Sequence, residues 1–239
     1  MRSVYFNGKF VPETEANISI YDSALMFGDM IFDMTRSYNK KQFRLRKHLE
    51  RLYNSMKSAE ISIDMSIDKM EKACLDTIKK NESFFEPHDE HRLMINVSRG
   101  PLSIYAEIFE GKLEPTIIIA DFPLKWTVRG MDRLYEMGIN AIVTSQRVIP
   151  EQIMDPKVKN RSRMFYMMAN IEVSKHKGNN NWALMLDPDD YIAEGSGANF
   201  FMVKDGTLYT PEPRNILVGI SRGYVFVDIV ILIGLMFFK

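Results

Sequence analysis

The spacing of apolar residues predicts two amphipathic helices in the first half of the chain. Leu49, Leu52 and Met56 recur every three or four residues, which places them on one face of a helix over residues 46–58. The same spacing continues over residues 67–78. We therefore expect two helices here, each with one buried face.

Short apolar runs and turn residues predict strands in both halves of the chain. The Asn7-Gly8 pair accepts positive φ at low cost, so it predicts a hairpin between residues 4–6 and 9–11. A helical repeat runs from Met164 to Lys175. The other predicted strands lie at residues 93–97, 115–120, 140–144, 182–186, 199–203 and 207–209, with a turn at 204–206 between the last two.

This mixture of helices and strands predicts an α+β or α/β protein of two domains. A chain of 239 residues with 46% hydrophobic content is long enough for one large domain or two smaller ones. The stretch at residues 121–126 is suited to cross between domains. We place the boundary near Pro123, which gives a small domain at 1–122 and a larger one at 123–239.

Charge and cysteine content limit the partners and the cellular compartment that we expect for this protein. Acidic and basic residues number 31 each, which argues against nucleic acid or an anionic membrane as the main partner. The single Cys74 excludes an internal disulfide, and the first residues lack the apolar core of a signal peptide, so we expect a cytoplasmic protein. The four histidines have no tight metal-ligand spacing, and no metal site is expected.

The chain ends in a nearly unbroken apolar run after Arg222, interrupted by Asp228. The run is shorter than the roughly 20 residues that a membrane-spanning helix needs, and an acidic residue near its middle is costly in lipid. We do not expect a membrane span.

A lysine and a glutamate are the strongest candidates for chemistry. Lys159 precedes the helical repeat, and Glu194 is followed by small residues that let a flat ring approach the backbone. An amine that forms a Schiff base and a carboxylate that keeps a pyridine nitrogen protonated are what a pyridoxal phosphate enzyme requires. The alternative for Lys159 is a solvated lysine of a basic loop, in which Lys157 competes for the same role.

Four segments of the chain, in this order, resemble the fold-type IV pyridoxal-phosphate enzymes. They are the block from Tyr21 to Asp33, the sequence His48-Leu-Glu-Arg-Leu, the lysine and glutamate segments, and Val218-Gly-Ile-Ser-Arg at the end. The family includes branched-chain and D-amino acid aminotransferases, R-selective amine transaminases and aminodeoxychorismate lyases. The resemblance covers about residues 7–222 and implies a two-domain homodimer whose active site lies near the domain junction.

The resemblance also implies roles for individual residues. Lys159 matches the Schiff-base lysine, and Glu194 matches the carboxylate that contacts the pyridine nitrogen. Arg51 matches a phosphate-binding arginine, for which the alternative is an exposed helix arginine paired with a nearby acid. The phosphate is expected to be held from the other side by Gly219, Ile220 and Ser221, where a helix would start.

Substrate motifs of the family are missing from this chain. Arg99-Gly100 is followed by Pro101-Leu-Ser-Ile, without the Arg-x-His of the D-amino acid enzymes, and Arg92-Leu-Met94 stands where branched-chain enzymes carry Tyr-x-Arg. Their tyrosine five positions after the lysine is Met164 here.

We expect a cytoplasmic aminotransferase that acts on a branched-chain-like amino acid and a 2-oxo acid. The alternatives are a lyase of the aminodeoxychorismate type and a non-catalytic remnant. The remnant is considered because the elements that usually follow Arg222 in the family are missing, which makes us expect an incomplete second domain that binds the cofactor weakly.

Overall fold

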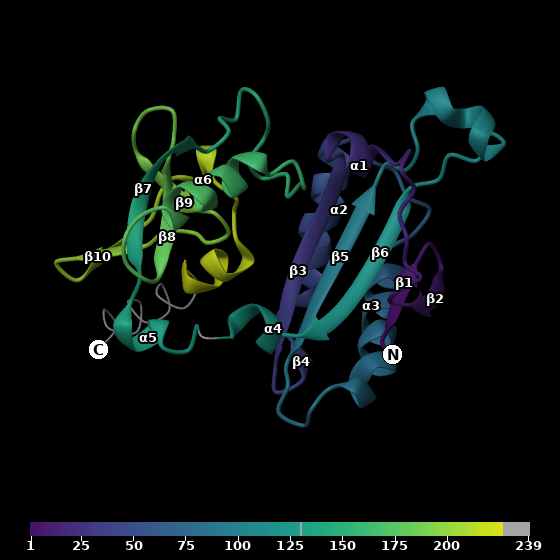
Figure 1. Ribbon diagram of the computed structural model, residues 1–239, viewed down its shortest axis with the longest axis horizontal. Coiled ribbons are helices and arrows are strands. Elements are labelled where there is room, and N and C mark those ends of the chain that lie inside the picture. The colour runs from purple at the N-terminus through teal and green to yellow at the C-terminus, as the bar shows by residue number, and fades with distance from the viewer. Residues whose placement is uncertain (130, 227–239) are drawn as a thin grey trace, which may run out of the picture. The chain divides into compact units, whose positions relative to one another are not determined.

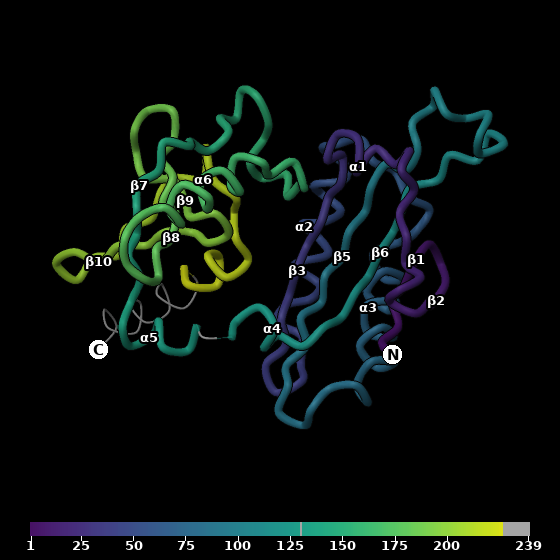
Figure 2. The backbone as a smooth tube through the Cα atoms, viewed as in Figure 1, coloured from purple at the N-terminus to yellow at the C-terminus, as the bar shows by residue number. Residues whose placement is uncertain are grey.

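A six-stranded antiparallel sheet dominates the first half of the chain in the computed structural model, which describes residues 1–129 and 131–226 (Figure 1). The strand order is β2-β1-β6-β5-β3-β4. The strands are β1 (Ser3–Phe6), β2 (Lys9–Pro12), β3 (Met30–Tyr38), β4 (Lys41–Gln42), β5 (His91–Ser98) and β6 (Thr116–Pro123). The three long strands β3, β5 and β6 run side by side (Figure 2).

Two helices cover one face of this sheet, α2 (Leu45–Ser58) and α3 (Ile67–Asn81) (Figure 1). Both predicted helices are confirmed, and α3 continues three residues beyond the predicted end. The buried core between helices and sheet contains Leu49, Leu52, Met56, Met70, Cys74, Ile31, Leu93, Ile95 and Val97. The apolar faces seen in the sequence therefore meet the alternating apolar residues of β5.

Shorter elements complete this first unit, which comprises Met1–Arg133 and Val158–Arg163. They are α1 (Ser23–Phe27), α4 (Lys125–Val128) and the 3-10 turns Glu82–Phe84 and Ser103–Phe109. The predicted hairpin is confirmed, because Asn7 and Gly8 both have positive φ, 44° and 88°, between β1 and β2.

The long central strand β3 does not follow from the sequence pattern. Its side chains at Ile31, Asp33, Thr35 and Ser37 are all buried, but three of these four are polar. The alternation that marks a half-buried strand is therefore hidden, and the polar groups are satisfied by hydrogen bonds within the fold instead.

The second unit comprises Leu134–Lys157 and the chain from Met164 onward. A three-stranded sheet of β7 (Asn140–Arg147), β8 (Asn181–Leu186) and β9 (Ile192–Gly195) is packed against α6 (Met164–Ser174). β7 and β8 are parallel, whereas β8 and β9 are antiparallel. The remaining elements are α5 (Leu134–Met137), the hairpin β10 (Met202–Lys204) and β11 (Thr207–Tyr209), and the 3-10 turn Pro213–Asn215.

Two predicted segments differ from the structure. Residues 199–201 are not part of a strand, because the side chain of Asn199 bonds the carbonyl of Leu217 and only Met202–Lys204 pairs with β11. The predicted domain crossing at 121–126 is also wrong in part, since β6 continues to Pro123. The domain boundary near Pro123 stays a prediction.

The end of the chain lies mostly outside the described residues. Residues 227–239 carry the predicted apolar tail, including Asp228, and are not described. Within residues 1–129 and 131–226, no helix combines the length and the hydropathy that a membrane crossing requires.

Candidate active site

Lys159 lies on the short segment that borders β3 in the first unit. Its carbonyl accepts a hydrogen bond from the backbone N–H of Phe32 at 2.9 Å, and its own N–H donates to the Ser55 hydroxyl at 3.2 Å. The Lys159 Nζ atom is 4.6 Å from the centre of the Phe32 ring. The backbone of Lys159 is thus fixed on both sides, by β3 and by α2.

The competing lysine has a different environment. Lys157 is exposed, and its backbone N–H bonds the side chain of Asp155 in a local turn. Lys159 is half-buried. Burial disfavours a charged amine, and a Schiff-base lysine has to react in its neutral form, so the environment of Lys159 is the more suitable of the two.

Arg161 stacks on the same aromatic ring as Lys159. Its guanidinium carbon is 3.7 Å from the ring centre of Phe32, and its Nε and Nη2 donate to the Asn96 side chain at 3.1 and 2.7 Å. Burial, reinforced by the charge of Arg163, lowers the pKa of Arg161 to about 10. The neighbourhood of the candidate lysine is therefore cationic and partly desolvated.

Arg51 lies on α2 and forms a two-point ion pair with Asp33. Its Nε and Nη2 donate to the two carboxylate oxygens, each at 2.8 Å, and His48 Nδ1 is 2.7 Å from Oδ1 of the same carboxylate. Burial would raise the pKa of Asp33, but the hydrogen bonds from His48 and Arg51 outweigh it and lower that pKa. The ion pair fixes the orientation of the guanidinium.

The sequence left open an exposed helix arginine paired with a nearby acid; the structure has the pairing, but only 13% of the Arg51 side chain is exposed. The phosphate role of Arg51 stays a prediction. Ser55, which receives the Lys159 N–H, is one helical turn further along α2 than Arg51. Arg51 is therefore part of α2, and the backbone of Lys159 is bonded to the same helix through Ser55.

Glu194 is buried on β9 in the second unit. Its Oε1 accepts a 2.6 Å hydrogen bond from the Tyr166 hydroxyl, and its Oε2 accepts from the Leu217 N–H at 3.1 Å and the Asn199 amide at 3.4 Å. Only 5% of the residue is exposed. This burial excludes a solvated position for the Glu194 side chain.

The predicted phosphate segment is connected to Glu194 through Asn199. The Asn199 amide also donates to the Leu217 carbonyl at 2.8 Å, two residues before Gly219. Helical backbone begins at Ile220, and the Gly223 N–H donates to the Gly219 carbonyl at 3.0 Å. A Cβ atom at Gly219 would overlap Oδ1 of Asn199, so any larger residue here would displace the Asn199 side chain.

The geometry of this segment is compatible with anion binding. Gly219 precedes the helix and Ser221 is in its first turn, where backbone N–H groups have no intrahelical acceptor. Ser221 is exposed. The binding of phosphate by Gly219, Ile220 and Ser221 stays a prediction.

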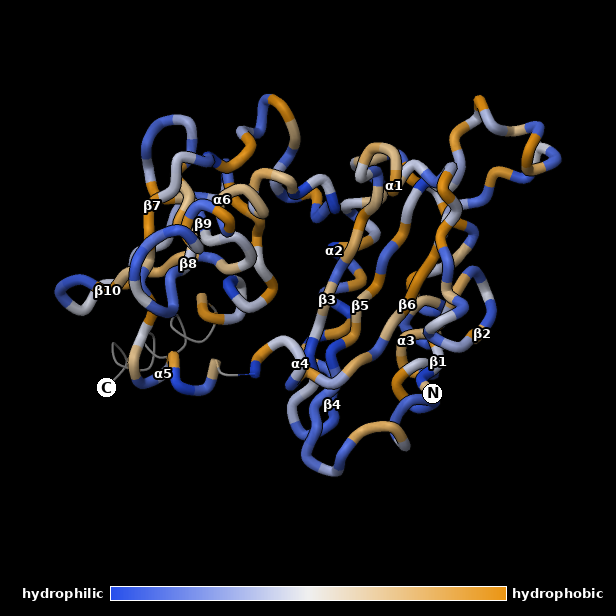
Figure 3. The backbone as a smooth tube through the Cα atoms, viewed as in Figure 1, coloured by the Kyte–Doolittle hydropathy of each residue, from blue (hydrophilic) through white to orange (hydrophobic). Residues whose placement is uncertain are grey.

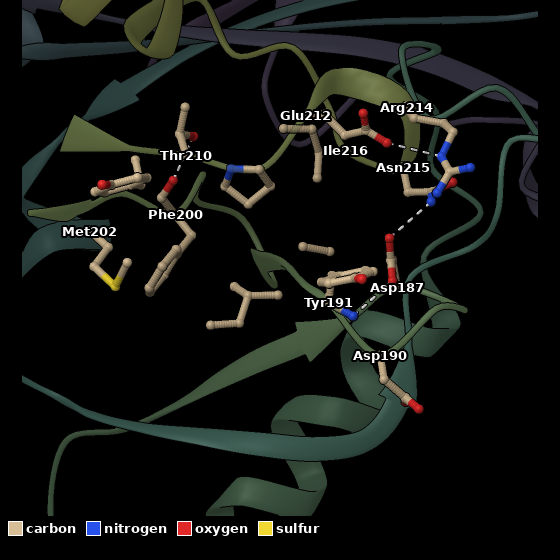
Figure 4. A pocket seen from close by; sticks show the side chains of 14 residues that line it. Asp187, Asp190, Tyr191, Phe200, Met202, Thr210, Glu212, Arg214, Asn215 and Ile216 are labelled. Carbon is tan, nitrogen blue, oxygen red and sulfur yellow. Dashed lines mark hydrogen bonds and ion pairs between the residues drawn. The ribbon is translucent and has the colours of Figure 1, made fainter. Parts of the chain in front are cut away.

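A pocket of about 610 Å³ lies in the same unit (Figure 4). Aromatic and apolar side chains, among them Tyr191, Phe200 and Met202, line it together with Asp187 and Arg214. Ala193 contributes to the lining, and its neighbour Glu194 on β9 does not. The Glu194 side chain is therefore not part of the pocket lining.

Two residues of this site were missed by the sequence analysis. Tyr166 and Asn199 both donate to Glu194, and Tyr166 lies on α6, seven residues after Lys159. No local spacing marks a hydrogen-bond partner that is 28 residues away. Among residues 1–129 and 131–226, no three His, Cys, Asp or Glu side chains are grouped to hold a metal ion.

Comparison with known proteins assigns the fold and the chemistry. The family described as "Amino-transferase class IV" matches residues 30–228. The chain belongs to the class IV aminotransferases. It is similar to a putative branched-chain-amino-acid aminotransferase of Methanocaldococcus jannaschii, with 34% identity over 93% of this chain and 73% of the relative. A branched-chain-amino-acid aminotransferase of Escherichia coli is 30% identical, over 92% of this chain and 70% of the relative.

Solved structures of branched-chain aminotransferases have the same fold. The Escherichia coli enzyme superposes with a TM-score of 0.82 at 27% identity, over 98% of this chain and 75% of that one. The T.th. enzyme, solved with N-(5'-phosphopyridoxyl)-L-glutamate, gives 0.81 at 27% identity over 97% and 74%. The predicted α+β fold, the aminotransferase activity and the pyridoxal phosphate cofactor are confirmed for this class IV aminotransferase, and the lyase alternative is not favoured.

Proposed function

We propose that this aminotransferase moves an amino group between a branched-chain-like amino acid and a 2-oxo acid, with Lys159 as the Schiff-base lysine. The substrate class is taken from the names of its relatives, which are branched-chain-amino-acid aminotransferases. The observation that supports Lys159 most is its half-buried position on a backbone held by Phe32 and Ser55, in contrast to the exposed Lys157.

The residues present fit pyridoxal phosphate, which when bound supplies an electron sink for the carbanion formed on the substrate. Glu194 is proposed to accept a hydrogen bond from the pyridine nitrogen, because its carboxylate is buried and oriented by Tyr166. Arg51 and the segment Gly219-Ile220-Ser221 are proposed to bind the phosphate. Lys159 Nζ would take a proton from the substrate α-carbon and return it to the cofactor carbon C4′.

Borohydride trapping tests the assignment of the lysine. The purified chain is incubated with pyridoxal phosphate and reduced, and the modified peptide is mapped by mass spectrometry. The label is expected on Lys159 and is expected to vanish in Lys159→Ala, whereas Lys157→Ala, the matched control, keeps it. A label on Lys157 with Lys159 unmodified would reject the proposal.

We also propose that the chain works as a homodimer in the cytoplasm. An exposed apolar patch supports the dimer: Leu25 and Phe27 of α1 and Ile104 and Ile108 of the turn Ser103–Phe109 are 57–75% exposed. Tyr21 joins the two segments, with ring centres 4.7 Å from Tyr105. Figure 3 shows these hydrophobic stretches at α1 and in the loop between β5 and β6.

The dimer is tested by the mass of the protein in solution. The mass of one chain is 27.8 kDa, and light scattering should give twice this value. Phe27→Glu should shift the protein to the monomer. Tyr135→Glu, at a 92% exposed position of the second unit, is the control and should leave the dimer intact. A monomeric parent protein would contradict the proposal.

The cysteine content supports the proposed location in the cytoplasm. The single cysteine, Cys74, is a buried free thiol, which suits a reducing compartment.

A further inference from the structure

The pocket of the second unit is lined mainly by apolar and aromatic side chains (Figure 4). Besides Tyr191, Phe200 and Met202, the lining includes Ile192 and Ile216. Met202 is 44% exposed and Ile192 is 37% exposed. Contact between this apolar surface and water is unfavourable, so a pocket of about 610 Å³ with this lining calls for a cover.

The helical residues 220–226 lie against the wall of this pocket. Arg222 donates from Nη2 to the Pro211 carbonyl at 2.9 Å and from Nε to the Thr210 hydroxyl at 3.4 Å. Both acceptors belong to residues that line the pocket. The ring centre of Phe226 is 6.3 Å from that of Phe201, which follows a pocket-lining residue. The described part of the chain therefore ends, at Phe226, beside the pocket.

The sequence that follows has the composition of a hydrophobic core. Residues 227–239 read Val-Asp-Ile-Val-Ile-Leu-Ile-Gly-Leu-Met-Phe-Phe-Lys, in which Asp228 and Lys239 are the only charged side chains. An extended chain spans about 3.5 Å per residue, so this segment, which we call the apolar tail, is long enough to cross the pocket from Phe226.

Arg222 offers a partner for the one acidic residue of the apolar tail. Only 8% of Arg222 is exposed, and the two acceptors that it bonds are neutral. Among residues 1–129 and 131–226, no carboxylate lies within ion-pair distance of its guanidinium. A buried guanidinium is stabilised by a carboxylate that bonds it directly, and Asp228 is six residues away along the chain.

We infer that the apolar tail folds back into the pocket of the second unit, covers its apolar lining and pairs Asp228 with Arg222. Ile216 lines the pocket, and the N–H of the next residue, Leu217, donates to Glu194. The tail would therefore also support the segment that orients the Glu194 carboxylate. This packing is independent of which lysine binds the cofactor.

Digestion by a carboxypeptidase, followed by mass spectrometry, measures whether the apolar tail is covered. The parent protein should lose residues 227–239 at least about tenfold more slowly than Met202→Glu, which places a charge in the pocket. Val203→Glu is the matched control, because the next residue of β10 is 71% exposed and does not line the pocket. It should be digested as slowly as the parent. Thermal melting verifies that both variants are folded.

Two further changes test the tail itself. Asp228→Lys should release the tail to the carboxypeptidase, whereas Asp228→Glu, which keeps the negative charge, should not. A chain that ends at Phe226 should bind more of the apolar dye anilinonaphthalene sulfonate than the parent and should melt about 4 °C lower or more. If this shortened chain does not fold, the digestion of Met202→Glu and Asp228→Lys decides.

Three results would overturn the inference. The first is a parent protein whose tail is digested as fast as that of Met202→Glu, and the second is an equal loss of protection in Val203→Glu. The third is protection that weakens as the protein is diluted, because the pocket would then be filled by a second copy of the chain. Unchanged protection in Asp228→Lys would reject the pairing with Arg222.

Discussion

Each unit of this aminotransferase has a buried carboxylate at its candidate site, and the two are held by different donors. Asp33 in the first unit is paired with the guanidinium of Arg51 and the ring of His48. Glu194 in the second unit accepts hydrogen bonds from a phenol, an amide and a backbone N–H. The guanidinium of Arg51 brings positive charge to Asp33, whereas these three donors of Glu194 orient the carboxylate without adding charge.

The difference predicts separate roles for the two carboxylates. A buried ion pair adds little net stability compared with an apolar core, but removing one partner leaves the other buried and unpaired. A phenol, an amide and a backbone N–H are neutral donors, and they fix the orientation of a carboxylate. We therefore expect Asp33 to serve stability and the position of Arg51, and Glu194 to serve the cofactor.

The largest effect is expected from Asp33→Ala. The variant leaves Arg51 and His48 without their shared partner, so the free energy of unfolding should fall by about 3–5 kcal/mol. Urea denaturation measures it. Asp68→Asn breaks an exposed pair with Arg46 of α2 and should change stability little. If Asp33→Ala is no less stable than Asp68→Asn, the Asp33 network is not the stabilising one.

A smaller effect is expected from Tyr166→Phe, which removes one donor from Glu194. A hydrogen bond to a charged group contributes about 1.5–3 kcal/mol, and the loss should appear both in unfolding and in weaker binding of pyridoxal phosphate. Tyr209→Phe, at a half-exposed tyrosine of β11, serves as the control. Cofactor binding that is insensitive to Tyr166→Phe would show that the orientation of Glu194 does not depend on this hydroxyl.

The fold could be predicted from the sequence wherever buried faces are apolar. The helices α2 and α3 and the first hairpin follow from periodicity and from the Asn7-Gly8 pair. β3 could not be predicted, because Asp33 stands where an apolar residue would mark the buried face. Asp33, which positions Arg51, is therefore also the residue that makes β3 hard to predict.

The candidate site could be predicted only at its chemically distinctive positions. Lys159 and Glu194 were found through a family resemblance, and their environments in the structure suit the predicted roles. Tyr166 and Asn199 were not found, since the hydrogen bonds that join them to Glu194 depend on how β9, α6 and the loop at Leu217 pack. Neither residue type is diagnostic by itself.

Two glycines, one in the predicted phosphate segment and one just after it, test the role of Asn199 in the second unit. Gly219→Ala places a methyl group on Oδ1 of Asn199, so it should displace the amide that holds Glu194 and cost about 1–3 kcal/mol. Gly223→Ala meets no atom within 4 Å and lies in the helix, so it should stabilise the protein by about 0.5–1 kcal/mol. Thermal melting of both variants measures the difference, and equal effects would contradict the role of Asn199.

The smallest effect concerns a third buried network, in which the cation can lose its charge. His91 lies between Asp121, at 2.9 Å from Nδ1, and Glu82, at 2.8 Å from Nε2, and it stacks on Phe85. Burial opposes its charged form, but the hydrogen bonds and charges of Asp121 and Glu82 raise the pKa of His91 above its ordinary 6.5.

A raised pKa makes the contribution of His91 fully present below pH 6.5 and lost as the pH rises through the folded-state value. Burial opposes ionisation of Glu82 too, but the hydrogen bond from Lys40 and the charge of His91 lower the pKa of Glu82 below 4.5. The contribution of Glu82 to stability is therefore present above pH 4.5 and lost as the pH falls further. Burial raises the pKa of Asp121, the other partner of His91, so on acidification the network loses charge earlier than Glu82 alone would imply. The stability difference between the parent and His91→Gln should therefore be largest just below pH 6.5 and shrink at higher pH, apart from a constant offset for the lost stacking on Phe85. His176→Gln, at an exposed histidine, is the control. A difference that is constant from pH 5 to 9 would mean that His91 is neutral in the folded protein and that this network resembles that of Glu194 rather than that of Asp33.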